Sequence, residues 1–175
     1  MNKVKGFAVW ITGLPASGKS SITGELVSRL NREGISPVVL ESDAMRRVLT
    51  PEPTYALDER DRFYLQLSEL GAMLVRQGMP VIFDATANRQ AYRDHARTRI
   101  ARFVEVFVDC TVELCRYRDP KGIYQAASQG TASNVPGLQA VYETPPSPEV
   151  AVDCRQSPSV SAERIVAYLK EHCYI

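Results

Sequence analysis

The segment GLPASGKSS, residues 13–21, follows an apolar run at residues 7–11 and precedes a stretch with helical spacing. It fits the pattern Gly-x-x-x-x-Gly-Lys-Ser, which cradles nucleotide phosphates when it lies between a strand and a helix. Backbone N–H groups and the positive end of the helix would hold the phosphates, Lys19 would bridge the outer ones, and the Ser20 hydroxyl would ligate Mg²⁺. The expected nucleotide contacts are Gly13, Leu14, Pro15, Ala16, Ser17, Gly18, Lys19, Ser20 and Ser21. A glycine-rich turn can match the pattern by chance, but the flanking elements favour a phosphate loop.

Short apolar runs alternate with segments of helical period along the chain, the pattern of β-α-β units around a parallel sheet. Strands are predicted at residues 7–12, 37–41, 80–84, 104–109 and 149–153. Helices are predicted at residues 19–32, 57–77, 89–102, 112–118 and 161–171. Right-handed crossovers place the helices on both faces of the sheet. The sequence therefore predicts an α/β protein of the phosphate-loop NTPase class, with a parallel sheet between two helical layers.

The length and composition indicate one domain over residues 1–175, because 45% apolar content supplies one sizeable core. Residues 119–148 break the alternating rhythm and are rich in Gly, Pro, Ser, Thr and Asn. A loop of this length in a compact domain more often covers a site than links two domains. We therefore expect a mobile lid there.

The charge balance limits the classes of partner. With 21 basic and 20 acidic residues the net charge is +1, so no global field favours nucleic acid or an anionic membrane. The four cysteines form no Cys-x-x-Cys pair, which is typical of free thiols in a reducing cytoplasm. We expect a cytoplasmic protein that binds a small molecule and neither nucleic acid nor membrane. Its oligomeric state is left open, with a homodimer among the options.

The acceptor side of the site is expected at the end of the second strand, in VVLESDAMRRVL. Asp43 would lie at the carboxyl edge of the sheet, where ligands of open α/β sheets bind. A carboxylate there can orient and deprotonate an acceptor hydroxyl, although Asp43 can also cap the helix that follows. Arg46, one turn later, can pair with an anionic acceptor, and either Arg46 or Arg47 is expected to face solvent.

A second acidic residue is needed near the phosphates. The buried strand PVIFDAT ends in Asp84, at the position where phosphate-loop NTPases often hold Mg²⁺. Asp109, at the end of VEVFVD, matches by pattern alone. Asp84 is preferred as a metal ligand because its strand is expected beside the phosphate loop, with a strand-end turn as the alternative reading.

The lid sequence RDPKGIYQAASQG, with NVPG, YETPPSPEVAVD, GLPASGKS and DRF, resembles the adenylylsulfate (APS) kinases over nearly the whole chain. This resemblance implies a phosphate-loop kinase that uses MgATP to phosphorylate the ribose 3′-hydroxyl of adenosine 5′-phosphosulfate. It implies catalytic roles for Lys19, Asp43, Arg118 and Lys121. The acceptor contacts that it implies are Asp43, Arg46, Arg62, Lys121, Gly122 and Tyr124.

Three stretches depart from the family pattern. Leu65 stands where the family's acceptor-binding Asn is expected, and Val135 in NVPG replaces a Phe that stacks on the acceptor's adenine. Residues 83–87, FDATA, replace the family's FISPY and look more like polynucleotide-kinase relatives. The donor side is thus intact while the acceptor side has changed. A related kinase for another nucleotide-linked or sugar-like hydroxyl, and a noncatalytic phosphate-loop switch, are the alternatives.

Overall fold

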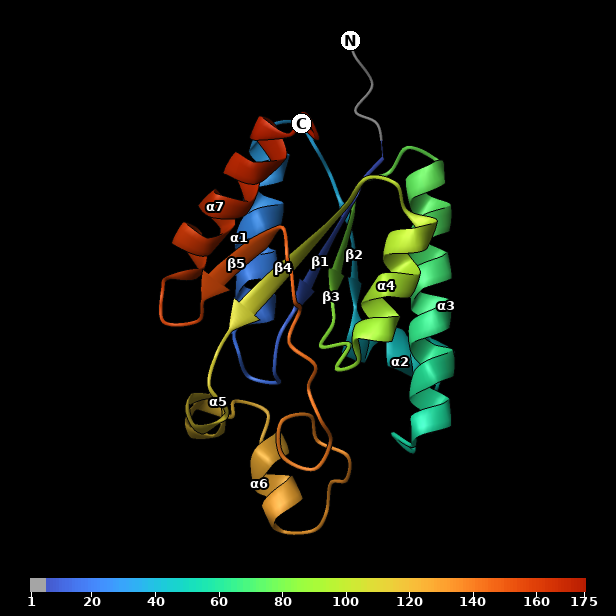
Figure 1. The fold of residues 1–175 in the computed structure, drawn as a ribbon, viewed down its shortest axis with the longest axis vertical. Helices are drawn as coiled ribbons and strands as arrows, with labels where there is room; N and C mark the ends of the chain where they lie inside the picture. The colour runs from blue at the N-terminus through green and yellow to red at the C-terminus, as the bar shows by residue number, and fades with distance from the viewer. Residues whose placement is uncertain (1–5) are drawn as a thin grey trace.

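The computed structural model describes residues 6–175 and contains a five-stranded sheet with the order β2-β3-β1-β4-β5 (Figure 1). All neighbouring strands are parallel. The strands are β1 (Ala8–Thr12), β2 (Val38–Glu41), β3 (Val81–Asp84), β4 (Phe103–Asp109) and β5 (Val150–Asp153). The predicted strands and their parallel arrangement are confirmed.

Seven helices connect or flank these strands within the described residues. They are α1 (Lys19–Arg32), α2 (Ser42–Leu49), α3 (Leu57–Arg76), α4 (Gln90–Arg99), α5 (Val112–Arg118), α6 (Ile123–Ser128) and α7 (Pro158–Glu171). The last helix starts earlier than predicted because Ser157 caps it and Pro158 occupies its first turn. Across residues 6–175, no helix combines the length and apolar character that a membrane span requires.

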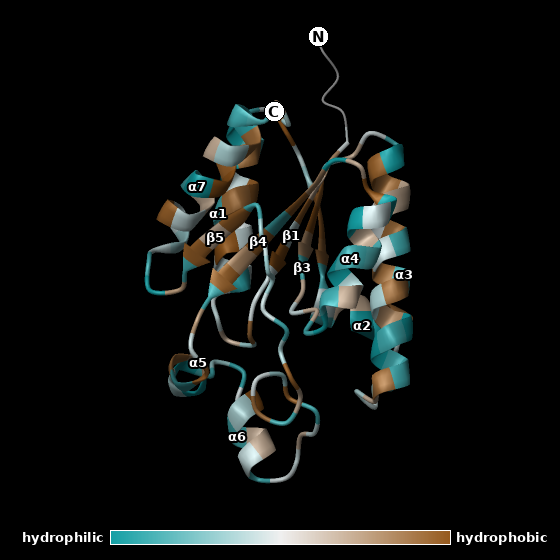
Figure 2. Ribbon diagram, in the orientation of Figure 1, coloured by the Kyte–Doolittle hydropathy of each residue, from teal (hydrophilic) through white to brown (hydrophobic). Residues whose placement is uncertain are grey.

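The alternation of side chains along β1 divides the core into two layers. Phe7, Val9 and Ile11 pack against α1 and α7, whereas Ala8 and Trp10 pack against α3 and α4. All five residues are completely buried, which makes β1 the centre of the molecule. Figure 2 shows mainly apolar strands between helices that carry both hydrophilic and apolar residues. The predicted helical layers on both faces are therefore confirmed.

The segment expected to be a lid contains structure that the sequence did not predict. Helix α6 lies within it, and a small apolar cluster joins Tyr124, Ala127 and Val135 to Cys115 and to Leu14 of the phosphate loop. The short helix has too few residues to show a clear period, so only the tertiary contacts reveal it. In Figure 1 the lid lies beyond the carboxyl ends of the strands.

The chain leaving the lid is tied to the sheet by Arg93 of α4, which is fully buried. Its guanidinium donates to the Glu105 carboxylate at 2.6 Å, to the Glu143 carbonyl at 2.6 Å and to the Ala87 carbonyl. A buried arginine requires such a complete set of acceptors. This network fixes one end of the lid beside the loop that follows β3.

Candidate active site

The phosphate loop lies between β1 and α1, as predicted. Gly13, Ala16 and Gly18 have positive φ angles of 154°, 62° and 101°. A Cβ atom on Gly13 would lie 2.8 Å from the Val108 carbonyl oxygen and 2.9 Å from Ser17 Oγ. Glycine is thus required at position 13 both for the backbone conformation and for the close approach to β4.

The polar groups of the loop suit phosphate oxygens. Lys19 is buried, and its ammonium donates to the carbonyls of Gly13 at 3.1 Å and Leu14 at 2.8 Å. Burial lowers the Lys19 pKa, while the nearby Asp84 acts to raise it. The Ser17 hydroxyl is buried and makes no hydrogen bond in the structure. A buried hydroxyl without a partner and a cation held by carbonyls fit a loop built to receive an anion.

Asp84 occupies the position expected of a metal ligand. It ends β3 in register with Ile11 of β1 and Glu41 of β2 and is buried. Burial raises the Asp84 pKa, whereas Lys19 and a hydrogen bond from Ser20 act to lower it. The Ser20 hydroxyl and the Asp84 carboxylate are the hard oxygen donors that Mg²⁺ prefers. These two residues therefore fit a magnesium ion.

Asp109 differs from Asp84 by its surroundings and not by its strand's place in the sheet. Both β3 and β4 flank β1, so the expectation that adjacency alone separates the two acids was incomplete. Asp109 is exposed and lines a cavity with Cys110 and Cys154. Burial beside Lys19 is what singles out Asp84.

Asp43 lies in the first turn of α2 and does not cap that helix. The cap is Glu41, whose carboxylate accepts hydrogen bonds from the backbone N–H groups of Asp43 at 3.1 Å and Ala44 at 2.8 Å. The Asp43 side chain is half exposed and accepts a hydrogen bond from Lys121 Nζ of the lid at 2.5 Å. This hydrogen bond to Asp43 raises the Lys121 pKa. The structure thus brings together two of the predicted catalytic residues across the mouth of the site.

Arg46, one turn after Asp43, is buried, and Arg47 is exposed, as expected for one of the two. The Arg46 guanidinium donates to Glu59 Oε1 at 2.7 Å and lies 4.0 Å from the centre of the Phe63 ring. Glu59 also accepts from the Thr54 backbone and hydroxyl and from the Tyr55 N–H. Glu59 therefore joins Arg46 to the loop that precedes α3.

The structure places Arg60, and not Arg62, on the buried side of α3. Arg62 is 73% exposed and pairs with Asp58. Arg60 is buried, donates to the Asn134 carbonyl at 2.6 Å, and has a buried Nε without a partner. Burial, with the adjacent charge of Arg46, lowers the Arg60 pKa. Glu59, Phe63 and Leu67 recur every four residues and mark the buried face of α3. This helical period is the sequence signal that could have distinguished the buried Arg60 from the exposed Arg62.

Leu65 and Val135 are the two positions at which the sequence departs from the family's acceptor contacts. Neither side chain faces an open surface of the candidate site. Leu65 is 48% exposed on the outer side of α3. Val135 is buried in the lid cluster with Tyr124 and Leu14. Tyr55, whose ring lies 4.9 Å from the Arg46 guanidinium and is 41% exposed, is the aromatic residue that borders the two buried arginines.

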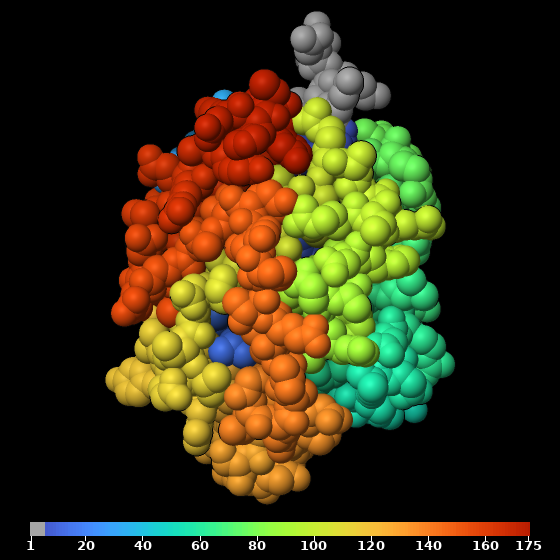
Figure 3. All heavy atoms as spheres, in the orientation of Figure 1, coloured from blue at the N-terminus to red at the C-terminus, as the bar shows by residue number. Residues whose placement is uncertain are grey.

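The remaining predicted site residues lie in the lid or directly before it. Tyr124 is buried and its hydroxyl donates to the Pro15 carbonyl at 3.2 Å, so it contacts the phosphate loop. Gly122 has a φ of 65° and is the N-cap residue of α6. Arg118 is exposed at the end of α5 and donates to the Cys154 carbonyl at 2.9 Å. In Figure 3, blue atoms from the early part of the described chain are exposed between the yellow atoms around α5 and the orange atoms of the chain that follows the lid.

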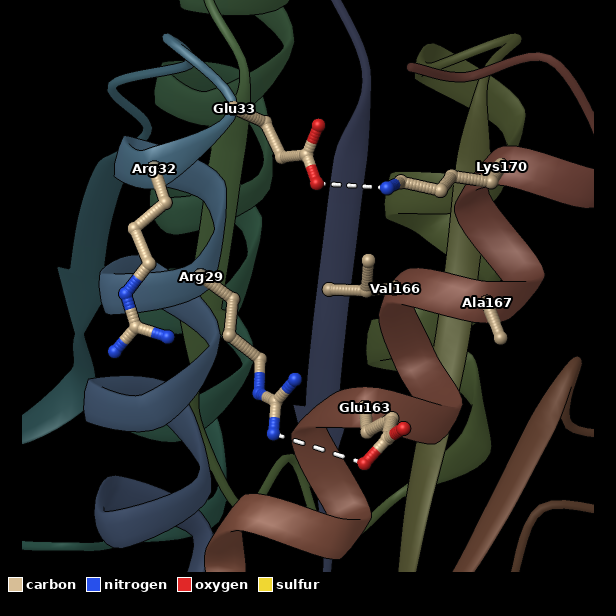
Figure 4. Close-up of a pocket in the computed structure, with 7 residues that line it drawn as sticks. All are labelled: Arg29, Arg32, Glu33, Glu163, Val166, Ala167 and Lys170. Carbon is tan, nitrogen blue, oxygen red and sulfur yellow. Dashed lines mark hydrogen bonds and ion pairs between the residues drawn. The ribbon is translucent and has the colours of Figure 1, made fainter.

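A cavity of about 310 Å³ lies elsewhere, between α1 and α7. It is lined by Arg29, Arg32, Glu33, Glu163, Val166, Ala167 and Lys170 (Figure 4). Two ion pairs cross it, Lys170 to Glu33 at 2.7 Å and Arg29 to Glu163 at 3.7 Å. None of the predicted catalytic residues lines it, so the phosphate-loop edge remains the candidate site.

The parallel sheet, the phosphate loop and the carboxylate facing a lid lysine define a phosphate-loop kinase. The family model described as adenylylsulphate kinase matches residues 5–153, and the chain belongs to that family. The adenylyl-sulfate kinase of Citrobacter koseri is 40% identical over 154 residues, covering 87% of this chain and 77% of the relative. The probable adenylyl-sulfate kinase of Pyrococcus abyssi is 32% identical, covering 98% of this chain and 99% of the relative.

The solved structures agree with this family. The Mycobacterium tuberculosis APS kinase, solved with AMPPNP and APS, superposes with a TM-score of 0.90 at 30% identity. The match covers 95% of this chain and 98% of that one. A gluconokinase from Sinorhizobium meliloti, at 19% identity and a TM-score of 0.61, shares the fold. The chain is accordingly a phosphotransferase that acts on a hydroxyl group.

Proposed function

We propose that this chain transfers the γ-phosphate of ATP to the 3′-hydroxyl of adenosine 5′-phosphosulfate, within one domain whose lid spans residues 119–148. The observation that best supports this function is that α2 carries both a carboxylate and a buried arginine at the site. Asp43 faces the lid lysine, while Arg46 lies one turn away and is buried near Arg60. A base beside two buried guanidinium groups suits a hydroxyl acceptor that carries an anionic group.

Each residue of the proposed site has its own role in phosphoryl transfer. Lys19 and the loop N–H groups hold the outer phosphates of ATP, and Ser20 and Asp84 hold Mg²⁺, which would neutralise phosphate charge. Asp43 takes the proton of the acceptor hydroxyl. Lys121 leaves Asp43 as the acceptor enters and supplies positive charge from the lid. Arg46 and Arg60 bind the acceptor's anionic group, with Tyr55 beside its base.

The test is a screen of purified protein with ATP and Mg²⁺ against APS, a nucleoside diphosphate, gluconate and water, with product masses measured directly. We expect one product, APS heavier by one phosphoryl group. A phosphorylated sugar acid, or ADP released without a phosphorylated acceptor, would contradict the proposed acceptor. Omitting Mg²⁺, or replacing it with excess chelator, should abolish turnover.

Glu59→Gln is expected to raise the KM for APS about tenfold, the equivalent of one lost charge-assisted hydrogen bond, and to leave the KM for ATP within about twofold. The carboxylate accepts from Arg46 on one oxygen and from Thr54 and Tyr55 on the other. An amide has only one acceptor oxygen, so its NH₂ group must face one of these donors. Initial rates with each substrate varied in turn measure the effect.

The matched control is Asp58→Asn, because Asp58 is exposed in the same first turn of α3. It should leave both KM values unchanged. Thermal unfolding of Glu59→Gln separates a local change from loss of fold. Equal rises in the two KM values would contradict the assignment of Glu59 to the acceptor side.

The same proposal includes a cytoplasmic protein that binds neither nucleic acid nor membrane, with its oligomeric state left open and a homodimer among the options. The near-neutral charge and the free thiols support the location and the partner class. Light scattering coupled to size-exclusion chromatography measures the mass in solution and so determines the oligomeric state.

A further inference from the structure

Three of the four cysteines gather at one corner of the molecule. Cys110 directly follows β4, Cys154 directly follows β5, and Cys115 lies on α5. Cys110 packs against both the main core that contains Cys154 and the lid cluster that contains Cys115. All are free thiols in the structure. Nothing in the phosphoryl-transfer reaction uses them.

The register of the sheet places Cys110 and Cys154 side by side. Asp109 and Asp153 are paired in parallel, and the Cys154 N–H donates to the Asp109 carbonyl at 3.0 Å, so the ladder continues beyond the pair. Neighbouring strands lie about 4.8 Å apart, and equivalent residues on parallel strands point to the same face. That spacing falls within the Cα separation of roughly 4.4–6.8 Å that a disulfide spans.

Of the two thiols, Cys110 is partly exposed and Cys154 is buried. A cavity of about 120 Å³ is lined by both, and its other lining residues are Asp109, Thr111, Leu114, Asp153 and Arg155. Cys110 is only partly buried, so a reagent can reach it from this cavity. Among residues 6–175, no group of three or more His, Cys, Asp or Glu side chains is arranged to hold a metal ion. The arrangement favours covalent chemistry between thiols.

We propose that Cys110 and Cys154 form a dithiol site that a low-molecular-weight disulfide oxidises to an intramolecular bridge, which restrains Arg118. One protein thiolate attacks the small disulfide, forming a mixed disulfide and releasing one small thiol. The second protein thiolate then attacks the protein sulfur of that bond and releases the second small thiol. The protein loses two protons and two electrons in total, and the reagent takes them up as it is reduced to two thiols.

The bridge would act on the active site through the base of α5. Arg118, at the end of that helix, donates to the carbonyl of Cys154 itself. Cys110 precedes the same helix by two residues. A bond between the two sulfurs would therefore tie the segment between β4 and α5 to the residue that directly follows β5. Arg118, which the family resemblance assigns to catalysis, would lose its freedom to leave Cys154.

The pair reacts slowly at neutral pH. Burial raises the pKa of Cys110 and of Cys154 to about 11, against the smaller opposing effect of Arg118. The other charged groups at this corner are Asp109, Asp153 and Arg155. Thiols with high pKa values contain little thiolate at neutral pH, so the exchange is slow and responds to sustained oxidation.

The experiment uses the full chain, reduced, desalted and then incubated with oxidised glutathione at mildly alkaline pH. Free thiols are alkylated, and intact and peptide masses are measured. We expect a Cys110–Cys154 cross-link, the loss of two hydrogens, and a kcat lower by at least about threefold that dithiothreitol restores. Cys110→Ser and Cys154→Ser should show no cross-link and no response of kcat to glutathione, each compared with its own reduced form.

Cys115→Ser and Cys173→Ser are the matched controls, and both should behave as the wild type does. Glutathione attached only to the exposed Cys173, or a bridge from Cys110 to Cys115, would overturn the proposed site. A complete Cys110–Cys154 bridge with unchanged kcat would overturn its link to Arg118. Because the masses do not depend on the acceptor, an error in the proposed acceptor would not hide the bridge.

Discussion

Replacing Lys19 by alanine is expected to lower kcat/KM by at least about a thousandfold with any acceptor, because the lysine stabilises charge on the transferring phosphoryl group. The side chain is already buried in the loop and held by the Gly13 and Leu14 carbonyls. Its removal therefore deletes an oriented cation from the centre of the site. Steady-state rates at saturating APS, with direct detection of ADP, measure the loss.

Lys170→Ala is the control for loss of a lysine. Lys170 is half exposed on α7 and pairs with Glu33 across the distant cavity (Figure 4). Surface pairs of this kind contribute roughly 0–1 kcal/mol to stability, so its activity and unfolding temperature should match the wild type. Turnover by Lys19→Ala at more than about a tenth of the wild-type rate would refute the assigned role of the loop.

Asp43→Asn is expected to reduce kcat at least about a hundredfold, while the affinity for ATP stays within a few fold. The substitution keeps the shape of the side chain but removes its charge and its ability to accept the hydroxyl proton. Asp43 does not cap α2, because Glu41 fills that position. The helix should therefore remain intact, and circular dichroism and thermal unfolding verify this.

Lys121→Gln separates the two functions available to Asp43. Both substitutions break the 2.5 Å ion pair between the lid and α2, but only Asp43→Asn removes the base. If the ion pair alone mattered, the two variants would lose activity equally. If the affinity for ATP collapses in Asp43→Asn, Asp43 belongs to the metal site and Asp84 becomes the candidate for the acceptor side.

The donor half of the site is largely a local property of the chain. The loop of residues 13–21 carries its own glycines, lysine and hydroxyl within one strand–loop–helix unit. The apolar run of β1 and the apolar period of α1 specify that unit without distant contacts. Asp84 was also placed correctly at a strand end, although its burial beside Lys19 became visible only in the structure.

The acceptor half depends on contacts between distant segments. Sequence spacing does not show that Arg60 contacts the Asn134 backbone or that Lys121 contacts Asp43, because these pairs are joined only when the lid folds over the sheet. Resemblance to a family motif pointed to Arg62, whereas the helical period of α3 turns that residue to solvent. Tertiary packing decides which of two nearby arginines is buried.

The sequence by itself determined the fold class, the phosphate loop, the five strands and five of the seven helices of the described residues, since these follow from hydrophobic period and local backbone chemistry. Only the tertiary structure decided the strand order in the sheet, the hydrogen-bonded set around Glu59 and the adjacency of Cys110 and Cys154. Local preferences act over one or two turns of chain. Side chains far apart in the sequence meet only through the topology of the sheet, which a linear pattern does not encode.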